Sequence, residues 1–248
     1  LIHKSITFEE FKSIISNYSY YQDDLIGDEV GIPLYFLGKL AKSNGLKVVQ
    51  VGEGADELFY GYEHWQRFVK LYKNIPKISK PNSNNYFKSH RPNLLFNIIQ
   101  NTNPFPGGAI GFNLAQIKKL VEFDFTNNSN LINYSDNLWQ DYLSRKDFSI
   151  TKWMTLIDLK IRLPELLLMR MDKLSMQSGV EARVPFLDHR IVEFVLSLPE
   201  NIIFDLNRTK PLLKDLSARY IPNKVLSRSK QGFRAPISNW IQKDPDYF

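Results

Sequence analysis

The chain contains no cysteine among its 248 residues. This absence excludes disulfide bonds and thiolate metal sites, and it fits a reducing compartment. No apolar run approaches the roughly 20 residues of a membrane-spanning helix, and no signal sequence opens the chain. We therefore expect a cytoplasmic protein that does not use a membrane as its partner.

The composition is that of an ordinary globular protein, with 43% hydrophobic and 23% charged residues. A chain of this length can form one or two domains with a core. The formal net charge of +6 would suit a polyanion, either a nucleic acid or a small phosphate compound. Only a basic cluster between Lys224 and Arg234 points to nucleic acid, so we do not expect nucleic acid as a partner.

The stretch from Val48 to Tyr62 carries the clearest chemical signal. A β-branched run ends in two closely spaced glycines, and three carboxylates fall between Glu53 and Glu57. Such a pattern is typical of a buried parallel strand that delivers its carboxyl end to a ligand. Clustered carboxylates can bind Mg²⁺ or act as a general base. The plainer alternative is a strand, a turn and an acidic helix start, where the helix dipole favours carboxylates.

Further motifs follow in order at Leu163–Met176, Gly179–Asp188, Thr209–Lys214 and Arg228–Phe233. Together with the acidic stretch, they resemble the synthetase domain of glutamine-dependent asparagine synthetases. The resemblance runs from about residue 33 to residue 240. Separate motifs in the right order make a chance match improbable, although residues 72–147 contribute little to it.

The resemblance implies a helix-rich α/β fold of the adenine-nucleotide alpha-hydrolase-like (ATP-pyrophosphatase) type, here lacking its N-terminal strands. It also implies ATP and Mg²⁺ as cofactors. In the family, the aspartate side chain attacks the α-phosphate of ATP to give β-aspartyl-AMP and pyrophosphate. Ammonia, supplied by a glutaminase domain, then displaces AMP and leaves asparagine. The resemblance leaves a homodimer open for the complete protein.

Residue by residue, the resemblance implies two catalytic groups, Glu53 and Lys210. Glu53 matches the base for ammonia attack, and Lys210 matches the lysine that stabilises negative charge on the phosphates. Val51 and Gly52 match positions whose backbone atoms meet the nucleotide. Asp56 matches the aspartate that helps to hold Mg²⁺ and pyrophosphate.

Several of these positions also have structural interpretations. Lys210 precedes a helical pattern and alone would be an ordinary solvated lysine. Glu57 and Tyr62 match family positions for which we assign no role. Arg170 lies two residues from an aspartate, so the two do not share a helix face and would pair elsewhere. We expect the segment Gly179–Asp188 to be core beneath the site.

Two features of the family are missing from the sequence. ATP pyrophosphatases carry a Ser-Gly-Gly-x-Asp-Ser loop whose N–H groups hold pyrophosphate. Residues 106–111 contain adjacent glycines but no such loop, and we interpret them as an ordinary turn. The family's glutaminase uses an N-terminal cysteine, which is also absent. Because the chain begins with Leu1, we expect it to be the C-terminal fragment of a longer polypeptide.

Local patterns predict the layout of the chain. Thr7 and Glu10 form a capping box that predicts a helix start. Residues 31–46 predict a helix with Leu34, Leu37, Leu40 and Ala41 on one face, and a strand follows at 47–51.

A helical run should begin after Asp56 and fade near Ile75. Residues 74–108 should be loop, and from Leu138 onward the pattern is helical. We expect one synthetase-type domain over 1–248 with a loop-rich insertion at about 74–135.

Other members of the same enzyme class remain open. A β-lactam-forming synthetase or an amidotransferase of surface-polysaccharide synthesis would activate a different carboxylate with the same motifs. A degenerate domain retained as a non-catalytic scaffold is the alternative outside enzymology.

We predict that these 248 residues alone do not make asparagine from aspartate, ATP and ammonia. The pyrophosphate loop and its metal-binding aspartate are absent from the sequence. A single donor to a developing charge is worth about 2.7–4 kcal/mol, so losing several donors and one Mg²⁺ ligand should remove several kcal/mol of transition-state stabilisation. Aspartate-dependent release of AMP from the purified chain is the measurement, and steady release would contradict the prediction.

Overall fold

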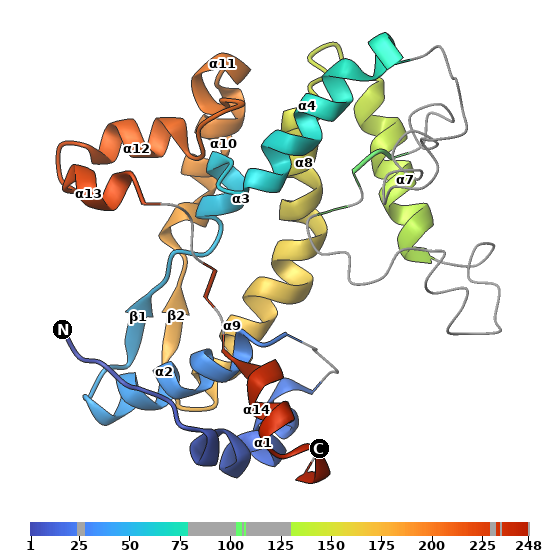
Figure 1. The fold of residues 1–248 in the computed structure, drawn as a ribbon. Helices are drawn as coiled ribbons and strands as arrows, with labels where there is room; N and C mark the ends of the chain where they lie inside the picture. The colour runs from blue at the N-terminus through green and yellow to red at the C-terminus, as the bar shows by residue number, and fades with distance from the viewer. Residues whose placement is uncertain are drawn as a thin grey trace. The chain divides into compact units, whose positions relative to one another are not determined.

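The computed structural model describes residues 1–23, 28–78, 103–105, 107, 130–228, 232–233 and 235–247 (Figure 1). The chain divides into two compact units. Unit 1 comprises Leu1–Gly54, Leu163–Ile191 and Pro222–Phe248, and unit 2 comprises Ala55–Arg162 and Val192–Ile221. The fold is a helix-rich α/β arrangement with a small parallel sheet, in agreement with the expected class.

Unit 1 contains helices around a two-stranded sheet. Its described elements are α1 (Phe8–Gln22), α2 (Gly31–Ser43), β1 (Val48–Gln50), α9 (Met169–Met176), β2 (Glu181–Arg183), η3 (Pro185–Leu187), α13 (Asn223–Leu226), α14 (Ile237–Lys243) and η4 (Pro245–Tyr247).

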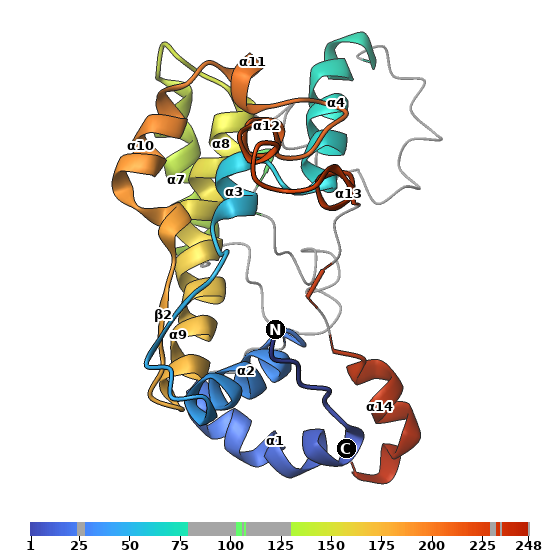
Figure 2. The ribbon, with the colours of Figure 1, turned by 90° about the vertical axis from the view of Figure 1, so that its left-hand side faces the viewer.

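The predicted capping box opens α1. The Thr7 hydroxyl accepts a hydrogen bond from the Glu10 amide, and the Glu10 carboxylate accepts one from the Thr7 amide at 2.9 Å. These bonds satisfy N–H groups that a helix start otherwise leaves free. Farther along α1, Phe11 stacks on Trp240 of α14 with ring centroids 4.9 Å apart, and both views of the ribbon place α14 beside α1 (Figure 2).

Helix α2 packs against α9 through a face that differs from the predicted one. The buried residues of α2 are Gly31, Ile32, Pro33, Leu34, Tyr35, Phe36 and Gly38. Leu37 was predicted to share one face with Leu34, but Leu37 is 48% exposed whereas Leu34 is buried. A side chain at Gly38 would place its Cβ 3.0 Å from the Leu174 carbonyl oxygen of α9, so the missing side chain allows the close approach. Gly38 therefore lies on the face of α2 that contacts α9. Leu37, one residue earlier in the helix, points about 100° away from Gly38.

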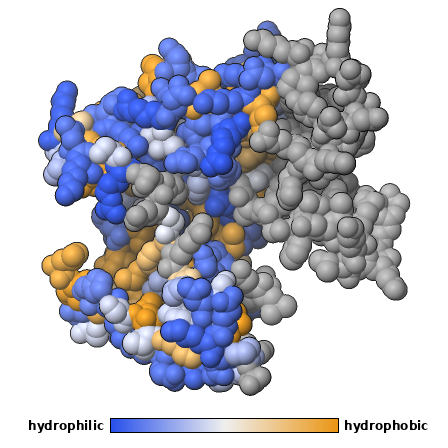
Figure 3. Space-filling model, in the orientation of Figure 1, coloured by the Kyte–Doolittle hydropathy of each residue, from blue (hydrophilic) through white to orange (hydrophobic). Residues whose placement is uncertain are grey.

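The sheet consists of β1 and β2, which pair in parallel with Val49 opposite Ala182. The predicted strand is confirmed, but the expectation that it is buried is wrong. Val48 is 38% exposed, and hydrophobic residues gather over the two strands in Figure 3. Within the described residues, β1 has only β2 as a strand neighbour, and this leaves its outer residues uncovered.

Strand β2 was not predicted from the sequence. Its three residues read Glu-Ala-Arg, and the first and last are exposed. The segment expected as core, Gly179–Asp188, is instead half-buried at Val184, Phe186 and Leu187, with Pro185 exposed. A strand this short and polar carries no period-2 hydrophobic signal, so the pattern could not reveal it.

Unit 2 is entirely helical in its described part. It contains α3 (Ala55–Phe59), α4 (Glu63–Ile78), α7 (Asn130–Leu143), α8 (Ile150–Ile157), α11 (Glu200–Ile203) and α12 (Pro211–Ser217). The π-helix η2 (Asp158–Leu168) and the helix α10 (His189–Ser197) each have residues in both units. Pro164 lies inside η2, and a proline lacks the N–H that a regular α-helix turn requires.

Aromatic side chains fill the core of unit 2. Trp65 and Trp153 are each fully buried. The Trp153 indole donates hydrogen bonds to Asn103 Oδ1 at 3.0 Å and to the Phe105 carbonyl at 3.2 Å. These bonds satisfy the polar edge of an otherwise apolar core. No helix of the described residues is long and apolar enough to cross a membrane.

The helical run expected after Asp56 is interrupted. The short helix α3 ends at Phe59, and α4 begins only at Glu63. Tyr60, between them, adopts the left-handed backbone region with φ of 59°. The predicted loop at 74–108, the break near residues 126–130 and the turn at 106–111 lie mostly outside the described residues.

Candidate active site

The acidic stretch is divided between the two units. Val51, Gly52 and Glu53 follow β1 in unit 1, whereas Asp56 lies in α3 of unit 2. The Val51 amide extends the pairing of the strands by donating to the Arg183 carbonyl at 2.9 Å. A Cβ added at Gly52 would meet no atom within 4 Å, so the backbone there is open to a ligand.

Gly54 ends the turn after the strand. Its φ is +85°, and an added Cβ would overlap the side chain of Leu187. The backbone conformation and the crowding both require glycine at this position. The second glycine of the motif therefore shapes the turn that carries Glu53.

Glu53 lies beside a buried cation in unit 1. The Arg170 side chain is 3% exposed, and its Nη2 atom is 3.9 Å from Glu53 Oε1. Its Nη1 atom pairs with Asp28. Burial lowers the pKa of Arg170. The expected pairing of Arg170 with a residue outside its own helix turn is confirmed, and Asp172 is exposed.

Asp56 and Lys210 form an ion pair in unit 2. The Lys210 Nζ atom lies 2.7 Å from Asp56 Oδ1, and each side chain is about one quarter exposed. Asp56 projects from α3, and Lys210 lies immediately before Pro211, the first residue of α12. The fold thus brings together one residue of the acidic stretch and one of the Thr209–Lys214 motif.

Glu57, the neighbour of Asp56, points into the interior. Its side chain is 1% exposed and accepts a hydrogen bond of 2.6 Å from the Tyr62 hydroxyl. Arg162 Nη1 lies 3.5 Å from Glu57 Oε1 and 3.1 Å from Asp158 Oδ2. The Arg162 guanidinium also lies over the Tyr62 ring, 4.8 Å from its centroid. Thr155 donates to the Glu57 carbonyl and so ties α8 to α3.

Burial dominates the titration of this interior network. It raises the pKa of the Glu57 carboxyl, and the hydrogen bond from Tyr62 opposes the rise only in part. Burial and the adjacent Glu57 charge also raise the pKa of Tyr62, which keeps its hydroxyl protonated as a donor. The network therefore supports α3 structurally. The sequence signal that could have revealed it is the position of Glu57 directly before the apolar residues Leu58 and Phe59, because a carboxylate buried beside them needs partners.

The described residues contain no group of three or more histidine or carboxylate side chains placed to share a metal ion. Asp56 is a half-buried carboxylate near the surface, while Glu57 is turned toward Tyr62 and Arg162. A Mg²⁺ ion commonly takes one or two protein carboxylates and completes its shell with phosphate oxygens and water. Asp56 fits that donor set.

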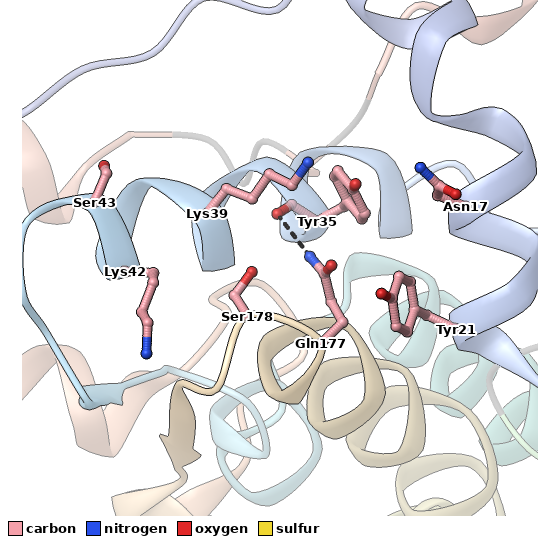
Figure 4. A pocket seen from close by; sticks show the side chains of 8 residues that line it. All are labelled: Asn17, Tyr21, Tyr35, Lys39, Lys42, Ser43, Gln177 and Ser178. Carbon is pink, nitrogen blue, oxygen red and sulfur yellow. Dashed lines mark hydrogen bonds between the residues drawn. The ribbon is translucent and has the colours of Figure 1, made fainter.

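A separate cavity of about 470 Å³ lies in unit 1 between α1, α2 and the end of α9 (Figure 4). Lys39 and Lys42 line it but point in different directions, and the Lys39 amine lies 4.6 Å from the Tyr35 ring centroid. The Gln177 amide donates to the Tyr35 carbonyl. No predicted site residue lines this cavity, and its cations do not converge on one point.

We predict that Glu57→Gln makes the stability of the protein less sensitive to pH. Because the folded state keeps the Glu57 proton above pH 4.5, where the unfolded chain loses it, rising pH lowers the free energy of unfolding of the wild type. The loss is at most about 1.4 kcal/mol per pH unit and ends above the raised pKa. The glutamine variant lacks this term, so it should gain stability relative to wild type as pH rises from 4.5.

Urea unfolding across a pH series measures this difference. Asp172→Asn, which also replaces one carboxylate by an amide but at an exposed position, is the matched control. A constant difference between wild type and Glu57→Gln at all pH values would contradict the prediction.

Comparison with known proteins identifies the family. The family model for asparagine synthase matches residues 2–247. Asparagine synthetase [glutamine-hydrolyzing] 1 of Bacillus subtilis (strain 168) is 28% identical over 98% of this chain and 39% of its own length. Amidase chry2 of Gibberella zeae is 22% identical over 94% of this chain and 38% of its own length.

The chain thus spans about two fifths of the length of these curated relatives. The family match covers almost every residue, including both the strand-end motif and the Lys210 segment. The chain belongs to the asparagine synthase family.

Proposed function

We propose that residues 1–248 form the synthetase domain of an ATP-dependent amide-forming ligase of the asparagine synthetase type. The domain would have the adenine-nucleotide alpha-hydrolase-like fold without its N-terminal strands. The family match over residues 2–247 supports ligase chemistry at the family level. Aspartate is the proposed acid, and ammonia from a glutaminase domain is the proposed amine.

The observation that carries the proposal is the Asp56–Lys210 pair at 2.7 Å. These are the two residues to which the family resemblance assigns phosphate and metal contacts, and they come from motifs far apart in the sequence. A carboxylate and an amine side by side can bind a metal–phosphate group together. The carboxylate would bind the metal cation, and the amine would bind the phosphate anion. Both side chains are about one quarter exposed, so a ligand can reach the pair.

In the proposed first step, an oxygen of the substrate carboxylate attacks the α-phosphorus of ATP, and pyrophosphate leaves with its bonding electrons. Lys210 would stabilise the negative charge that develops on the phosphates. Val51 and Gly52 would place their backbone atoms against the nucleotide. Mg²⁺ held at Asp56 would neutralise phosphate charge when bound.

In the proposed second step, ammonia attacks the carbonyl carbon of the acyl-adenylate, and AMP leaves. Glu53 would accept the proton that the attacking nitrogen must lose. Its side chain is 24% exposed, so a substrate can reach it. The buried Arg170 guanidinium lies 3.9 Å away and would offset the charge of the carboxylate.

The acid that is activated stays open between aspartate and the carboxylates of related enzymes. A β-lactam-forming synthetase and a surface-polysaccharide amidotransferase use the same motifs, and the roles proposed for Val51, Gly52, Asp56 and Lys210 concern the nucleotide and the metal rather than the acid. The non-catalytic scaffold is disfavoured because the acidic and basic site residues are retained together as a pair.

We predict that Asp56→Asn in the complete protein cripples adenylation. An amide oxygen is a weaker ligand for a hard cation than a carboxylate, and it also cannot form the ion pair with Lys210. Substrate-dependent exchange of labelled pyrophosphate into ATP, which reports the first step alone, should fall steeply and recover little with added Mg²⁺. Asp172→Asn is the control, and exchange near the wild-type rate in Asp56→Asn would assign Asp56 to the start of α3 alone.

We predict that Glu53→Gln in the complete protein impairs amide formation more than ATP consumption. Glutamine keeps the shape of the side chain but cannot accept a proton, and loss of a general base costs about 10²–10⁴-fold. The adenylate would then be lost to water, and the ratio of AMP to amide at saturating ammonia should rise.

The exposed Glu165 offers the matched control, Glu165→Gln, which should leave the ratio unchanged. An unchanged ratio at a normal rate in Glu53→Gln would remove Glu53 from the chemistry. An equal loss of both products would assign it to adenylation.

A further inference from the structure

Two left-handed residues meet at the base of the Asp56–Lys210 pair. Lys210 has φ of 51° and ψ of 48°, and Tyr60 has φ of 59°. The Lys210 amide donates a hydrogen bond to the Tyr60 carbonyl at 3.2 Å. Residues with a Cβ atom rarely adopt this left-handed backbone region. Those that do are held there by their surroundings and often mark functional sites.

The surroundings hold Tyr60 from several sides. Its ring is 1% exposed and meets Trp65 and Phe204 edge-on, with centroids 5.8 and 5.1 Å away. The Gln66 side chain donates a second hydrogen bond to its carbonyl at 3.3 Å. The core of unit 2 therefore holds Tyr60 in its left-handed conformation. The Tyr60 carbonyl in turn holds the Lys210 backbone through the hydrogen bond from the Lys210 amide.

Gly61 lies between Tyr60 and Tyr62 and is buried. Its amide donates to the Asp56 carbonyl at 2.8 Å, which closes the turn after α3. A Cβ atom at this position would overlap the Asp56 carboxylate oxygen and the Lys210 Cε atom. Gly61 has no positive φ, so glycine matters here through crowding, and a side chain would have to displace the Asp56 and Lys210 side chains.

We propose that Gly61 is a positioning residue for the Asp56–Lys210 pair. Its missing side chain lets the lysine lie across the turn with its amine against the carboxylate, so Gly61 sets where the cationic and anionic groups meet the phosphates and the metal. This role rests on the proposed function, whereas the positioning of the pair itself does not. A side chain at residue 61 separates the pair without changing either partner.

The test compares Gly61→Ala with Gly45→Ala in the complete protein. Gly45 has φ of +76° and no atom within 4 Å of an added Cβ, so it reports backbone strain without a collision. The first measurement is the rate at which a brief pulse of an amine-acetylating reagent modifies Lys210, read by mass spectrometry. In Gly61→Ala this rate should rise to that of Asp56→Ala, and in Gly45→Ala it should stay at the wild-type value.

The second measurement is pyrophosphate exchange into ATP. Displacement of a positioned group by about 1 Å can cost on the order of 10²-fold, and we expect a loss of this size in Gly61→Ala. Adding Gly61→Ala to Lys210→Ala should lower exchange no further, because both changes remove the same contact. The proposal would be overturned if the double variant lost the product of the two single-variant losses. It would also be overturned if the acetylation rate of Lys210 were unchanged in Gly61→Ala.

The two measurements separate this proposal from the proposed function. If Lys210 reacts faster in Gly61→Ala while Lys210→Ala exchanges normally, Gly61 positions the pair and the phosphate role of Lys210 is wrong. If Gly61→Ala does not fold, the double variant Asp56→Ala/Gly61→Ala lacks the overlapping carboxylate and should fold. Failure of that double variant to fold would also overturn the proposal.

Discussion

The pairing of each clustered carboxylate with a cation from a later part of the chain is the interaction on which the site depends. Glu53 lies 3.9 Å from Arg170, Asp56 lies 2.7 Å from Lys210, and Glu57 lies 3.5 Å from Arg162. Three carboxylates within five residues repel one another unless their charges are compensated. The downstream basic residues supply that compensation, the first within unit 1 and the other two within unit 2.

Helix geometry explains why neighbouring carboxylates have different environments. Adjacent residues of a helix point about 100° apart, so Asp56 and Glu57 cannot face the same way. Asp56 turns toward Lys210 near the surface, and Glu57 turns into the core of unit 2. The buried charge is tolerated because Tyr62 and Arg162 both contact it, since a buried carboxylate without partners would cost far more than a surface one.

Sequence patterns predicted elements that depend on local chemistry. The capping box at Thr7 and the strand at 47–51 were recoverable because their signals lie within a few residues. Strand β2 was not, since Glu181–Arg183 form a strand only by pairing with β1. The break at Tyr60 was also missed, because its left-handed backbone is imposed by Trp65 and Phe204 rather than by its own preference.

The candidate site divides in the same way. Its residue types and their order were visible in the sequence, and the family resemblance attached expected roles to them. Their pairing was not visible, because no spacing rule connects Asp56 with Lys210 or Glu53 with Arg170. Gly61 gave no signal either, since the two side chains that crowd it, Asp56 and Lys210, meet there only in the folded chain.

Solvent exposure distinguishes Glu53 and Asp56, which a ligand can reach, from Glu57, which supports helix α3. Glu53 and Asp56 are 24% and 25% exposed, whereas Glu57 is 1% exposed. A group that exchanges a proton or binds a metal must be reached by its ligand, and a group that holds a helix in place must not be. The two reachable carboxylates are the two to which the family resemblance assigns chemistry. The cation beside each, Arg170 for Glu53 and Lys210 for Asp56, compensates the charge of a carboxylate that a ligand can reach.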